Sequence, residues 1–315
     1  MNAKNTDYFE INGAKANFDE IYSRPDPRDY YRVLGGLDYV IPDLAKTPFR
    51  AIIETLRRVR KHRLKVADLG CSYGINAALL RYPLDIQRLA SRYTGQQMQH
   101  IDSLTLAELD RNYFQSWPLQ SDAQFIGIDT STPAIDYALH TGLIDGAVTT
   151  NLEDEEPSAT AASLLRGLDL LISTGCIGYT TEKSLLKILN LQRGGAPLPW
   201  VASLVLRMFP YDKIAENLSR FGLVTEKLEG VTFVQRRFHS SNECEATIGA
   251  LEKQGIDPTG KEADGLFHAE LYVSRPRAEA ERCRLGELIS VTSGAGRRYG
   301  RRYVRSPAGQ VKLTH

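Results

Sequence analysis

Cysteine and histidine are scarce in this chain of 315 residues, and neither is arranged as a set of metal ligands. The four cysteines, Cys71, Cys176, Cys244 and Cys283, are widely scattered and form no C-x-x-C pair. The sequence therefore indicates neither a disulfide framework nor a zinc knuckle. The six histidines show no H-E-x-x-H spacing. We expect reduced cysteines and no metal site.

Long hydrophobic runs are also missing. No apolar stretch approaches the roughly 20 residues that a membrane-spanning helix needs. The first residues, MNAKNTDYFEINGAK, lack the apolar core of a secretory signal. The hydrophobic share of 42% and the charged share of 24% are ordinary for a globular protein. These features predict a cytoplasmic protein with no membrane partner.

The net charge of +1 is too small for the whole molecule to bind polyanions by charge alone. The charge is uneven, however, because residues 275–315 hold nine arginines and one lysine against three glutamates. The stretch GAGRRYGRRYVRSPAGQ mixes arginine, tyrosine and glycine, as tails that bind single-stranded nucleic acid also do. We favour a solvated basic tail over residues 277–315 and disfavour a nucleic-acid partner. Homo-oligomer formation stays open.

What the chain does contain is a turn with two glycines in KVADLGCSYGINAALL, residues 65–80. A brief apolar strand precedes the turn and a helix-like run follows it. A phosphate loop would need Gly-Lys-Ser/Thr, but Ile75 follows the second glycine. A dinucleotide fingerprint fails as well, because its second and third glycines would fall on Ser72 and Ile75. The pattern that remains is D-x-G-x-S-x-G, from Asp68 to Gly74.

This pattern resembles the first motif of class I S-adenosylmethionine-dependent methyltransferases, usually written D/E-x-G-x-G-x-G. Ser72 stands in place of the middle glycine. The resemblance implies S-adenosylmethionine as cofactor and S-adenosylhomocysteine as its product. The contacts that it implies in this turn are Asp68, Gly70, Ser72 and Gly74. On this motif alone, an ordinary strand-to-helix turn without a ligand is an equal alternative.

A second acid stands where a nucleotide-binding fold requires one. In AQFIGIDTSTPAIDYAL, residues 125–128 form a strand, Asp129 ends it, and Pro133 follows two hydroxyl residues at a helix start. An acid at that strand end can accept hydrogen bonds from both ribose hydroxyls. Its alternative role is a helix cap. We favour the ribose contact.

Strands and helices continue to alternate along the chain. A third strand precedes Asn151 and Leu152, a fourth ends at Ser173, and a closing strand spans residues 267–276. By resemblance, Asn151 and Leu152 lie beside the adenine, and Ser173 also contacts the cofactor. The order predicts a doubly wound, seven-stranded, mainly parallel sheet of the Rossmann-like methyltransferase type, covering residues 48–276.

Two additions surround this core. Residues 1–47 precede the first core helix and are predicted to form a helical lid. The resemblance assigns substrate contacts in the lid to Tyr22, Arg28, Tyr30 and Tyr31. An inserted helical segment at about 84–122 accounts for the 129 − 74 = 55 residues from Gly74 to Asp129, where a plain unit needs about 20. For the insertion, packing on the outer helix layer is the alternative. For the N-terminal segment, the alternative is aromatic packing of a leading helix on the sheet.

Methyl transfer requires the acceptor and the methyl group to be held in line and water to be kept out. A base is needed only where the acceptor must lose a proton. The candidates for this role are Tyr179, Glu182 and His239. Arg236 and Arg237 are candidates for gripping a carboxylate or phosphate of the substrate, with an exposed strand end as their alternative role.

These observations predict a methyltransferase that acts on a small natural product or metabolite bearing an acidic group. The main alternative is an RNA or protein methyltransferase that uses the arginine-rich tail. Enzymes that methylate an amine of a base or of glutamine usually carry an N-P-P-Y-type tetrapeptide after the fourth strand, where this chain reads STGCIGY. A nicotinamide-dependent oxidoreductase and a non-catalytic binding protein are weaker alternatives. The acceptor atom stays open between oxygen, nitrogen and carbon.

Overall fold

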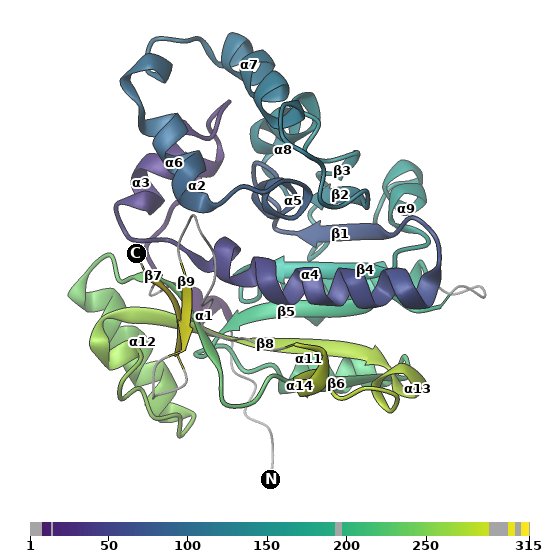
Figure 1. Cartoon of the computed structure of the whole chain (residues 1–315). Helices are drawn as coiled ribbons and strands as arrows, with labels where there is room; N and C mark the ends of the chain where they lie inside the picture. The colour runs from purple at the N-terminus through teal and green to yellow at the C-terminus, as the bar shows by residue number, and fades with distance from the viewer. Residues whose placement is uncertain (1–7, 14, 193–196, 290–301, 306–309, 315) are drawn as a thin grey trace.

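The computed structural model describes residues 8–13, 15–192, 197–289, 302–305 and 310–314 (Figure 1). One large sheet runs through the molecule, with helices on both of its faces. An additional helical lobe lies beyond one end of the sheet. Among these residues, no helix combines the length and the apolar character that crossing a membrane would require.

Five parallel strands form the half of the sheet that carries the expected motifs. They are β1 (Lys65–Leu69), β2 (Gln124–Ile128), β3 (Gly146–Val148), β4 (Leu170–Thr174) and β5 (Trp200–Leu206). Their spatial order is β3-β2-β1-β4-β5. The strands are buried on both faces and consist largely of apolar residues, as parallel strands covered by helices require. The prediction of a doubly wound α/β fold is confirmed.

The other half of the sheet is larger than expected. It contains β6 (Leu223–Lys227), β7 (Thr232–Arg237), β8 (Leu266–Pro276), β9 (Arg302–Arg305) and β10 (Gln310–Thr314). The long strand β8 runs antiparallel to β5, and its other edge pairs with β7 and then with β6. The sheet therefore has ten strands instead of the predicted seven, because β7, β9 and β10 extend it.

The strand order reverses between β1 and β4, which lie next to each other in the centre of the parallel half. Leu69 at the end of β1 is level with Ile128 of β2 on one side and with Ser173 of β4 on the other. The loops after these three strands therefore begin at the same edge of the sheet. Ligands of open α/β sheets bind at this kind of switch point.

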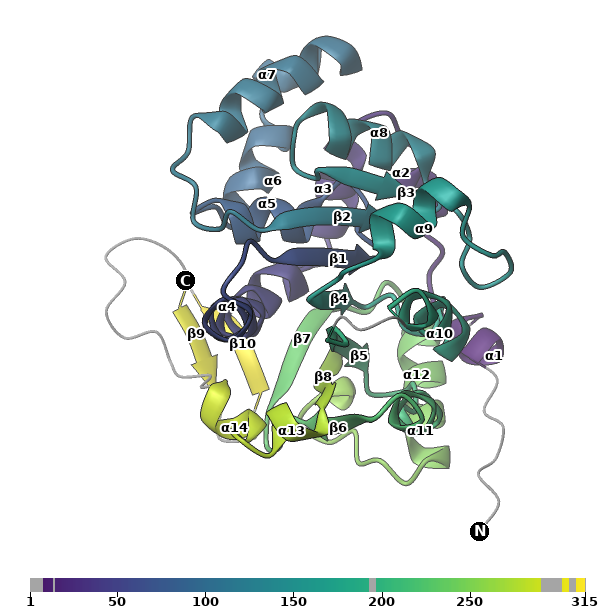
Figure 2. The same cartoon turned by 90° about the vertical axis from the view of Figure 1, so that its right-hand side faces the viewer.

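Helices cover both faces of the sheet. In Figure 2, α4 (Ile41–Arg60) lies on one face, and α10 (Glu182–Asn190) and α11 (Asp212–Ser219) lie on the other. The other helices that pack around the sheet are α5 (Ile75–Arg81), α8 (Thr132–His140), α9 (Ala159–Leu165), α12 (Ser241–Lys253) and the short η2 (Glu262–Asp264).

The first core helix, α4, was predicted from its apolar spacing. Of the five regularly spaced apolar residues, Phe49, Ile52, Ile53 and Leu56 are buried, whereas Val59 is 43% exposed. The helix begins at Ile41, with Pro42 in its first turn, where proline is well tolerated. The expected boundary between residues 47 and 48 therefore falls inside this helix.

The N-terminal segment and the insertion pack together as one helical lobe. It comprises α2 (Asp19–Tyr22), α3 (Arg28–Gly35), α6 (Ile86–Thr94), η1 (Gln96–Met98) and α7 (Ser103–Gln115). The first helix, α1 (Tyr8–Asn12), lies apart from this lobe beside α10 (Figure 2), where the Tyr8 ring meets Phe209 edge-on. Tyr31 of α3 stacks on Tyr93 of α6 at a centroid distance of 4.8 Å. The Tyr93 and Tyr137 hydroxyls are 2.8 Å apart, and Tyr137 donates to Asp110 of α7 at 2.7 Å. Buried aromatic contacts thus join the insertion to α3 and α8.

The segment predicted to be a solvated tail is in part built into the fold. It contains α13 (Arg277–Ala280) and α14 (Leu285–Leu288), and β10 pairs in parallel with β7. Glu279 accepts hydrogen bonds from Arg60 at 2.7 Å and from the Trp200 indole at 2.6 Å. Leu285 is 2% exposed. The apolar residues after Pro276 therefore complete the core beside α4. The prediction of a solvated tail was based on the many arginines of this segment and overlooked these apolar residues.

We expect a chain that ends at Pro276 to be less stable than one that ends at Ile289. The shorter chain loses the Glu279 carboxylate and the buried side chains of Leu285 and Ile289, each worth about 1.5–3 kcal/mol of burial. Its free energy of unfolding in urea should be lower by at least about 3 kcal/mol. Equal unfolding curves for the two chains would show that this segment does not belong to the core.

Candidate functional site

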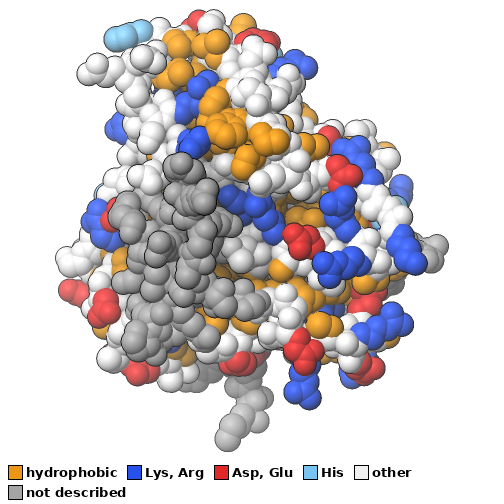
Figure 3. Space-filling view, viewed as in Figure 1, with side chains coloured by type: hydrophobic (Ala, Val, Ile, Leu, Met, Phe, Trp, Pro, Cys, Tyr) orange, Lys and Arg blue, Asp and Glu red, His pale blue; other side chains and the backbone are white. Residues whose placement is uncertain are grey.

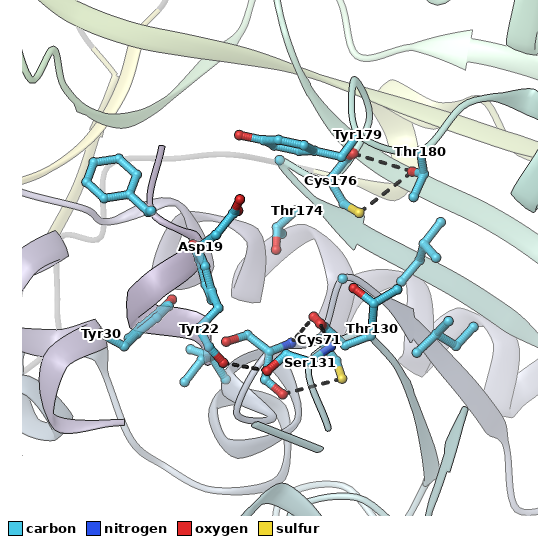
Figure 4. A pocket seen from close by; sticks show the side chains of 18 of the residues that line it. Asp19, Tyr22, Tyr30, Cys71, Thr130, Ser131, Thr174, Cys176, Tyr179 and Thr180 are labelled. Atoms are coloured by element: carbon cyan, nitrogen blue, oxygen red, sulfur yellow. Dashed lines mark hydrogen bonds between the residues drawn. The ribbon is translucent and has the colours of Figure 1, made fainter. Parts of the chain in front are cut away.

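A cavity of about 500 Å³ lies at the switch point of the sheet. Its floor is formed by the loops that follow β1 to β4, at residues 69–72, 128–131, 150–152 and 174–176. The N-terminal segment and the end of β7 supply the opposite walls. In Figure 4, Tyr179 and Thr180 lie across the cavity from Cys71 and Ser131. The volume is within the range of small-molecule and cofactor sites.

In the loop after β1, every second residue from Gly70 to Gly74 has a positive φ angle. Gly70 has φ +77°, and a Cβ atom there would lie 2.7 Å from the Cys176 sulfur. Gly74 has φ +75° and precedes α5, and a Cβ atom there would meet Leu143 at 3.1 Å. Gly70 lines the cavity, whereas Gly74 instead permits close packing of α5. Both glycines are thus required by the local geometry.

Ser72, which stands where the resembled motif has its middle glycine, also adopts a left-handed conformation, with φ +49°. This conformation costs an L-residue roughly 1–2 kcal/mol. The Ser72 hydroxyl is buried and has no hydrogen-bond partner among the described residues. The serine therefore contributes its backbone amide to the site and keeps a backbone shape that suits glycine.

We expect Ser72→Gly to leave the free energy of unfolding unchanged or to raise it by up to about 1 kcal/mol, because it relieves the left-handed strain. Gly70→Ala should lower it by about 1–3 kcal/mol, because the new methyl group meets Cys176 and the φ angle is unfavourable. Urea unfolding of the two variants measures both effects. A destabilised Ser72→Gly protein would contradict the assigned backbone role.

Asp129 connects the loops after β1 and β2. Its Oδ2 accepts a hydrogen bond from the Ser72 amide at 2.8 Å, and its Oδ1 accepts one from the Ser131 amide at 2.9 Å. Burial raises the pKa of this carboxyl, and the two amides oppose that shift. Each oxygen keeps a further lone pair, and the residue lines the cavity. The carboxylate is thus fixed in place with capacity to accept hydrogen bonds from a ligand.

Asp68 lies behind the cavity wall and is 1% exposed. Burial raises its pKa to about 7, against the effect of the hydrogen bond from Asn76 at 3.1 Å. Its other carboxylate oxygen has no partner among the described residues. The Asn76 amide also contacts the Thr174 hydroxyl at 3.0 Å, and both of these residues line the cavity. An unpaired buried carboxylate oxygen close to a cavity suits a ligand with a positive charge or a hydrogen-bond donor.

The loops after β3 and β4 supply the rest of the floor. Asn151 and Leu152 line the cavity, and the Asn151 amide is held by Asp154 at 2.8 Å. Ser173 does not line it, because it lies within β4 and is 1% exposed. Thr174 takes its place at the strand end. Sequence reasoning missed Thr174 and Asn76, although a polar residue in the first helical turn after a glycine loop was a usable signal.

The N-terminal segment covers the cavity, as expected of a lid. Tyr22 and Tyr30 line it, whereas Tyr31 points away and stacks on Tyr93. The Tyr73 hydroxyl contacts the carbonyl oxygens of Ile21 at 2.7 Å and Arg24 at 2.9 Å. The Ser131 hydroxyl donates to the Tyr22 carbonyl. Side chains from the loops after β1 and β2 therefore tether the segment over the cavity.

The three arginines proposed as substrate contacts all have partners within the protein. Arg28 lies outside the cavity and bonds to Asp26 and to the carbonyl oxygens of Met98 and Ile101 in the insertion. Arg237 also lies outside and bonds to Asp38 and the Gly36 carbonyl. Arg236 does line the cavity, but Glu243 binds its guanidinium through both carboxylate oxygens, at 2.7 and 2.9 Å. The partners of Arg237 and the carbonyl partners of Arg28 are distant in the chain, whereas Asp26 and Glu243 are only two and seven residues from their arginines.

Of the three candidates for proton transfer, only Tyr179 lines the cavity. Burial raises its pKa, and the negative charge of Asp19 adds to the shift. Glu182 begins α10 and pairs with Lys213 at 2.6 Å. His239 is exposed, and its ring meets Phe18 edge-on at a centroid distance of 6.0 Å. The structure therefore does not bring these three side chains together.

All four cysteines are free thiols. Cys71 and Cys176 line the cavity, and burial raises the pKa of Cys176 to about 12. A thiol with a raised pKa is a poor nucleophile at neutral pH. Within the described ranges, no group of three or more His, Cys, Asp or Glu side chains is placed to hold a metal ion.

Neither a protein-family model nor a curated protein matches this chain. Among solved structures, the plantazolicin methyltransferase BpumL in complex with a pentazolic desmethylPZN analog and SAH is similar at 13% identity, over 86% of this chain and 98% of that one, with a TM-score of 0.41. A TehB-like SAM-dependent methyltransferase from Corynebacterium glutamicum is similar at 15% identity, over 71% and 85%, with a TM-score of 0.34. A functionally unknown protein from Deinococcus radiodurans R1 is similar at 14% identity, over 68% and 80%, with a TM-score of 0.35. Sequence identities and TM-scores this low do not establish a function, which must therefore be argued from the site itself.

Proposed function

We propose that this protein is an S-adenosylmethionine-dependent methyltransferase that acts on a small molecule. The observation that carries the proposal is Asp129. This residue directly follows β2 and lines the cavity at the switch point. Its carboxylate is fixed by hydrogen bonds from the Ser72 and Ser131 amides. An acid in this position is suited to the two hydroxyls of a ribose.

The residues around Asp129 fit the remaining parts of the cofactor. Asn151 and Leu152 would border the adenine, and the turn at Gly70 would lie beside the methionine part, where only a backbone without a Cβ atom fits. The unpaired oxygen of Asp68 lies close to that part, and a bound positive charge would favour the ionised form of this carboxyl. Bound S-adenosylmethionine would supply a methyl group on a positively charged sulfur, which is a good leaving group.

The protein itself would mainly exclude water and orient the acceptor. The N-terminal segment that covers the cavity would provide the exclusion. Tyr179 would orient the acceptor as a hydrogen-bond donor, because a phenol is protonated at neutral pH and the pKa of this one is raised further. Glu182 and His239 lie outside the cavity, so this proposal gives them no catalytic role.

A small acceptor is favoured over a nucleic acid by the enclosure of the site and by the surface charge. On the described part of the face in Figure 3, basic side chains are interspersed with acidic ones. The arginine-rich stretch at residues 294–310 lies mostly outside the described residues. Any contribution from it is therefore decided by the experiment below.

Calorimetry with S-adenosylhomocysteine tests the cofactor, and methyl transfer tests the acceptor class. We expect one molecule to bind per chain with a Kd in the micromolar range, about −8 kcal/mol, and NAD not to bind. Labelled S-adenosylmethionine, incubated with a cell extract and the protein, should then transfer its methyl label to the small-molecule fraction. Label in RNA or protein would support the alternative substrate class, and absence of S-adenosylhomocysteine binding would contradict the proposal.

A further inference from the structure

Lys15 is a cavity residue that the sequence reasoning did not single out. It lies between α1 and α2, in the segment that covers the site. Its ammonium group is 4.4 Å from the centre of the Tyr179 ring and 5.7 Å from that of Phe209. The lysine therefore sits against aromatic faces at the wall of the cavity, where a cation is attracted to the ring quadrupole.

Lys15 and Arg236 are the two basic side chains that line the cavity among the described residues. They differ in their partners. Arg236 is neutralised by two hydrogen bonds to Glu243 and lies between the rings of Phe18 and Phe267, at 5.1 and 4.8 Å. Lys15, by contrast, forms no ion pair within the described part of the chain.

The Glu243 carboxylate acts on the charge of Lys15, and its hydrogen-bonding capacity is already used. Besides Arg236, it accepts hydrogen bonds from the Ala16 amide at 2.8 Å and from the His239 amide at 2.7 Å. The pKa of Lys15 is lowered to about 8, mainly by burial and then by the positive charge of Arg236, against the opposing effect of Glu243. A negative charge brought into the cavity would relieve both the burial and the repulsion.

The exposed carboxylate of Asp19 also lines the cavity, and its position limits what the cavity accepts. Its charge acts on the Tyr179 hydroxyl, on the same ring that Lys15 faces. One ammonium group in a cavity that a carboxylate also lines suits a single negative charge better than the double charge of a phosphate. Tyr179, which is 55% exposed, presents an open aromatic surface next to that position.

We infer that Lys15 anchors the carboxylate of a planar acceptor that stacks on Tyr179. This inference rests on the proposed function and specifies its substrate class as aromatic or similarly planar carboxylic acids. The sequence already predicted an acidic group on the substrate. We now assign the binding of that group to Lys15 and not to the three arginines, because the arginines have partners within the protein. The acceptor would then lie between Lys15 and the cofactor loops.

The test compares matched carboxylates and amides. Benzoate and benzamide, cinnamate and cinnamamide, and indole-3-acetate and indole-3-acetamide are titrated into protein saturated with S-adenosylhomocysteine, with benzylamine as a cationic probe. We expect at least one carboxylate to bind about tenfold or more tightly than its amide, because a charge-assisted contact in a partly buried site has this effect. The preference should disappear in Lys15→Met and be retained in part in Lys15→Arg.

Lys183→Met is the matched control, because Lys183 is an exposed lysine on α10 that does not line the cavity. It should keep the carboxylate preference. S-adenosylhomocysteine affinity is measured for every variant and should be unchanged, which shows that Lys15→Met has folded. No carboxylate preference in the wild type, its survival in Lys15→Met, or preferred binding of benzylamine would overturn the inference while leaving the proposed function standing. Failure of the wild type to bind S-adenosylhomocysteine would instead overturn the proposed function.

Discussion

Asp129→Asn is expected to weaken S-adenosylhomocysteine binding at least about tenfold, since a hydrogen bond to a charged group contributes about 1.5–3 kcal/mol. The substitution keeps the size of the side chain but removes its charge. It also replaces one of the oxygens that accept the Ser72 and Ser131 amides with an NH2 group. Either the loop after β1 or the loop after β2 thereby loses the hydrogen bond that fixes it to this side chain. Calorimetry with the purified variant measures the effect.

Asp136→Asn is the matched control for this experiment. Asp136 is an exposed aspartate on α8, the helix that Ser131 caps, so its loss should leave the affinity within about twofold, as for ordinary surface substitutions. Circular dichroism should show that both variants are folded. Equal affinities for the wild type and Asp129→Asn would remove the main support for a nucleoside-containing cofactor.

Glu243→Gln is expected to lower the free energy of unfolding by about 3–5 kcal/mol, the usual cost of removing one partner of a buried ion pair. The side chains of Arg236 and Glu243 are only 4% and 2% exposed. The glutamine would leave the guanidinium buried without its counter-charge. Urea unfolding at neutral pH measures this loss.

Two further variants separate the ion pair from other effects. The double variant Arg236→Met/Glu243→Met should be more stable than Glu243→Gln, because no unpaired charge remains in it. Glu245→Gln, an exposed substitution on the same helix, should change stability by less than about 0.5 kcal/mol. If Glu243→Gln is as stable as Glu245→Gln, the pair is not a stabilising contact.

The same pair predicts a dependence on pH. Burial alone would raise the pKa of Glu243, but the hydrogen bonds from Arg236 and from the Ala16 and His239 amides lower it overall. A carboxyl with a lowered folded-state pKa stabilises the protein at neutral pH, and this contribution is lost as the pH falls through that pKa. The stability difference between the wild type and Glu243→Gln should therefore shrink in acid.

The parallel half of the fold was predictable because its signals are local. Each strand is a short apolar run, and the turn at Gly70 and the acid at Asp129 directly follow strand ends. Parallel strands align their carboxyl ends, so residues 59 positions apart in the chain were expected at one edge of the sheet. Local pattern and topology are sufficient for this part of the site.

The walls of the cavity were harder to predict because they depend on long-range pairing. Arg237 bonds to Asp38, 199 residues away, and Arg28 bonds to the insertion. Nothing in the stretch VQRRFHSS distinguishes Arg236, which faces the cavity, from Arg237, which does not. Lys15 belongs to no sequence motif, and its place in the cavity wall depends on the N-terminal segment folding over Tyr179.

The two hydroxyl tethers of the N-terminal segment have a thermodynamic consequence. Tyr73 directly follows Ser72, whose amide is bound to Asp129, and its hydroxyl holds the carbonyls of Ile21 and Arg24. Ser131, whose amide binds the same carboxylate, holds the Tyr22 carbonyl. A ligand that holds these loops in place would also hold the segment over the cavity. We therefore expect a ligand on the floor and a ligand in the compartment above it to raise the affinity of the protein for each other by the same factor.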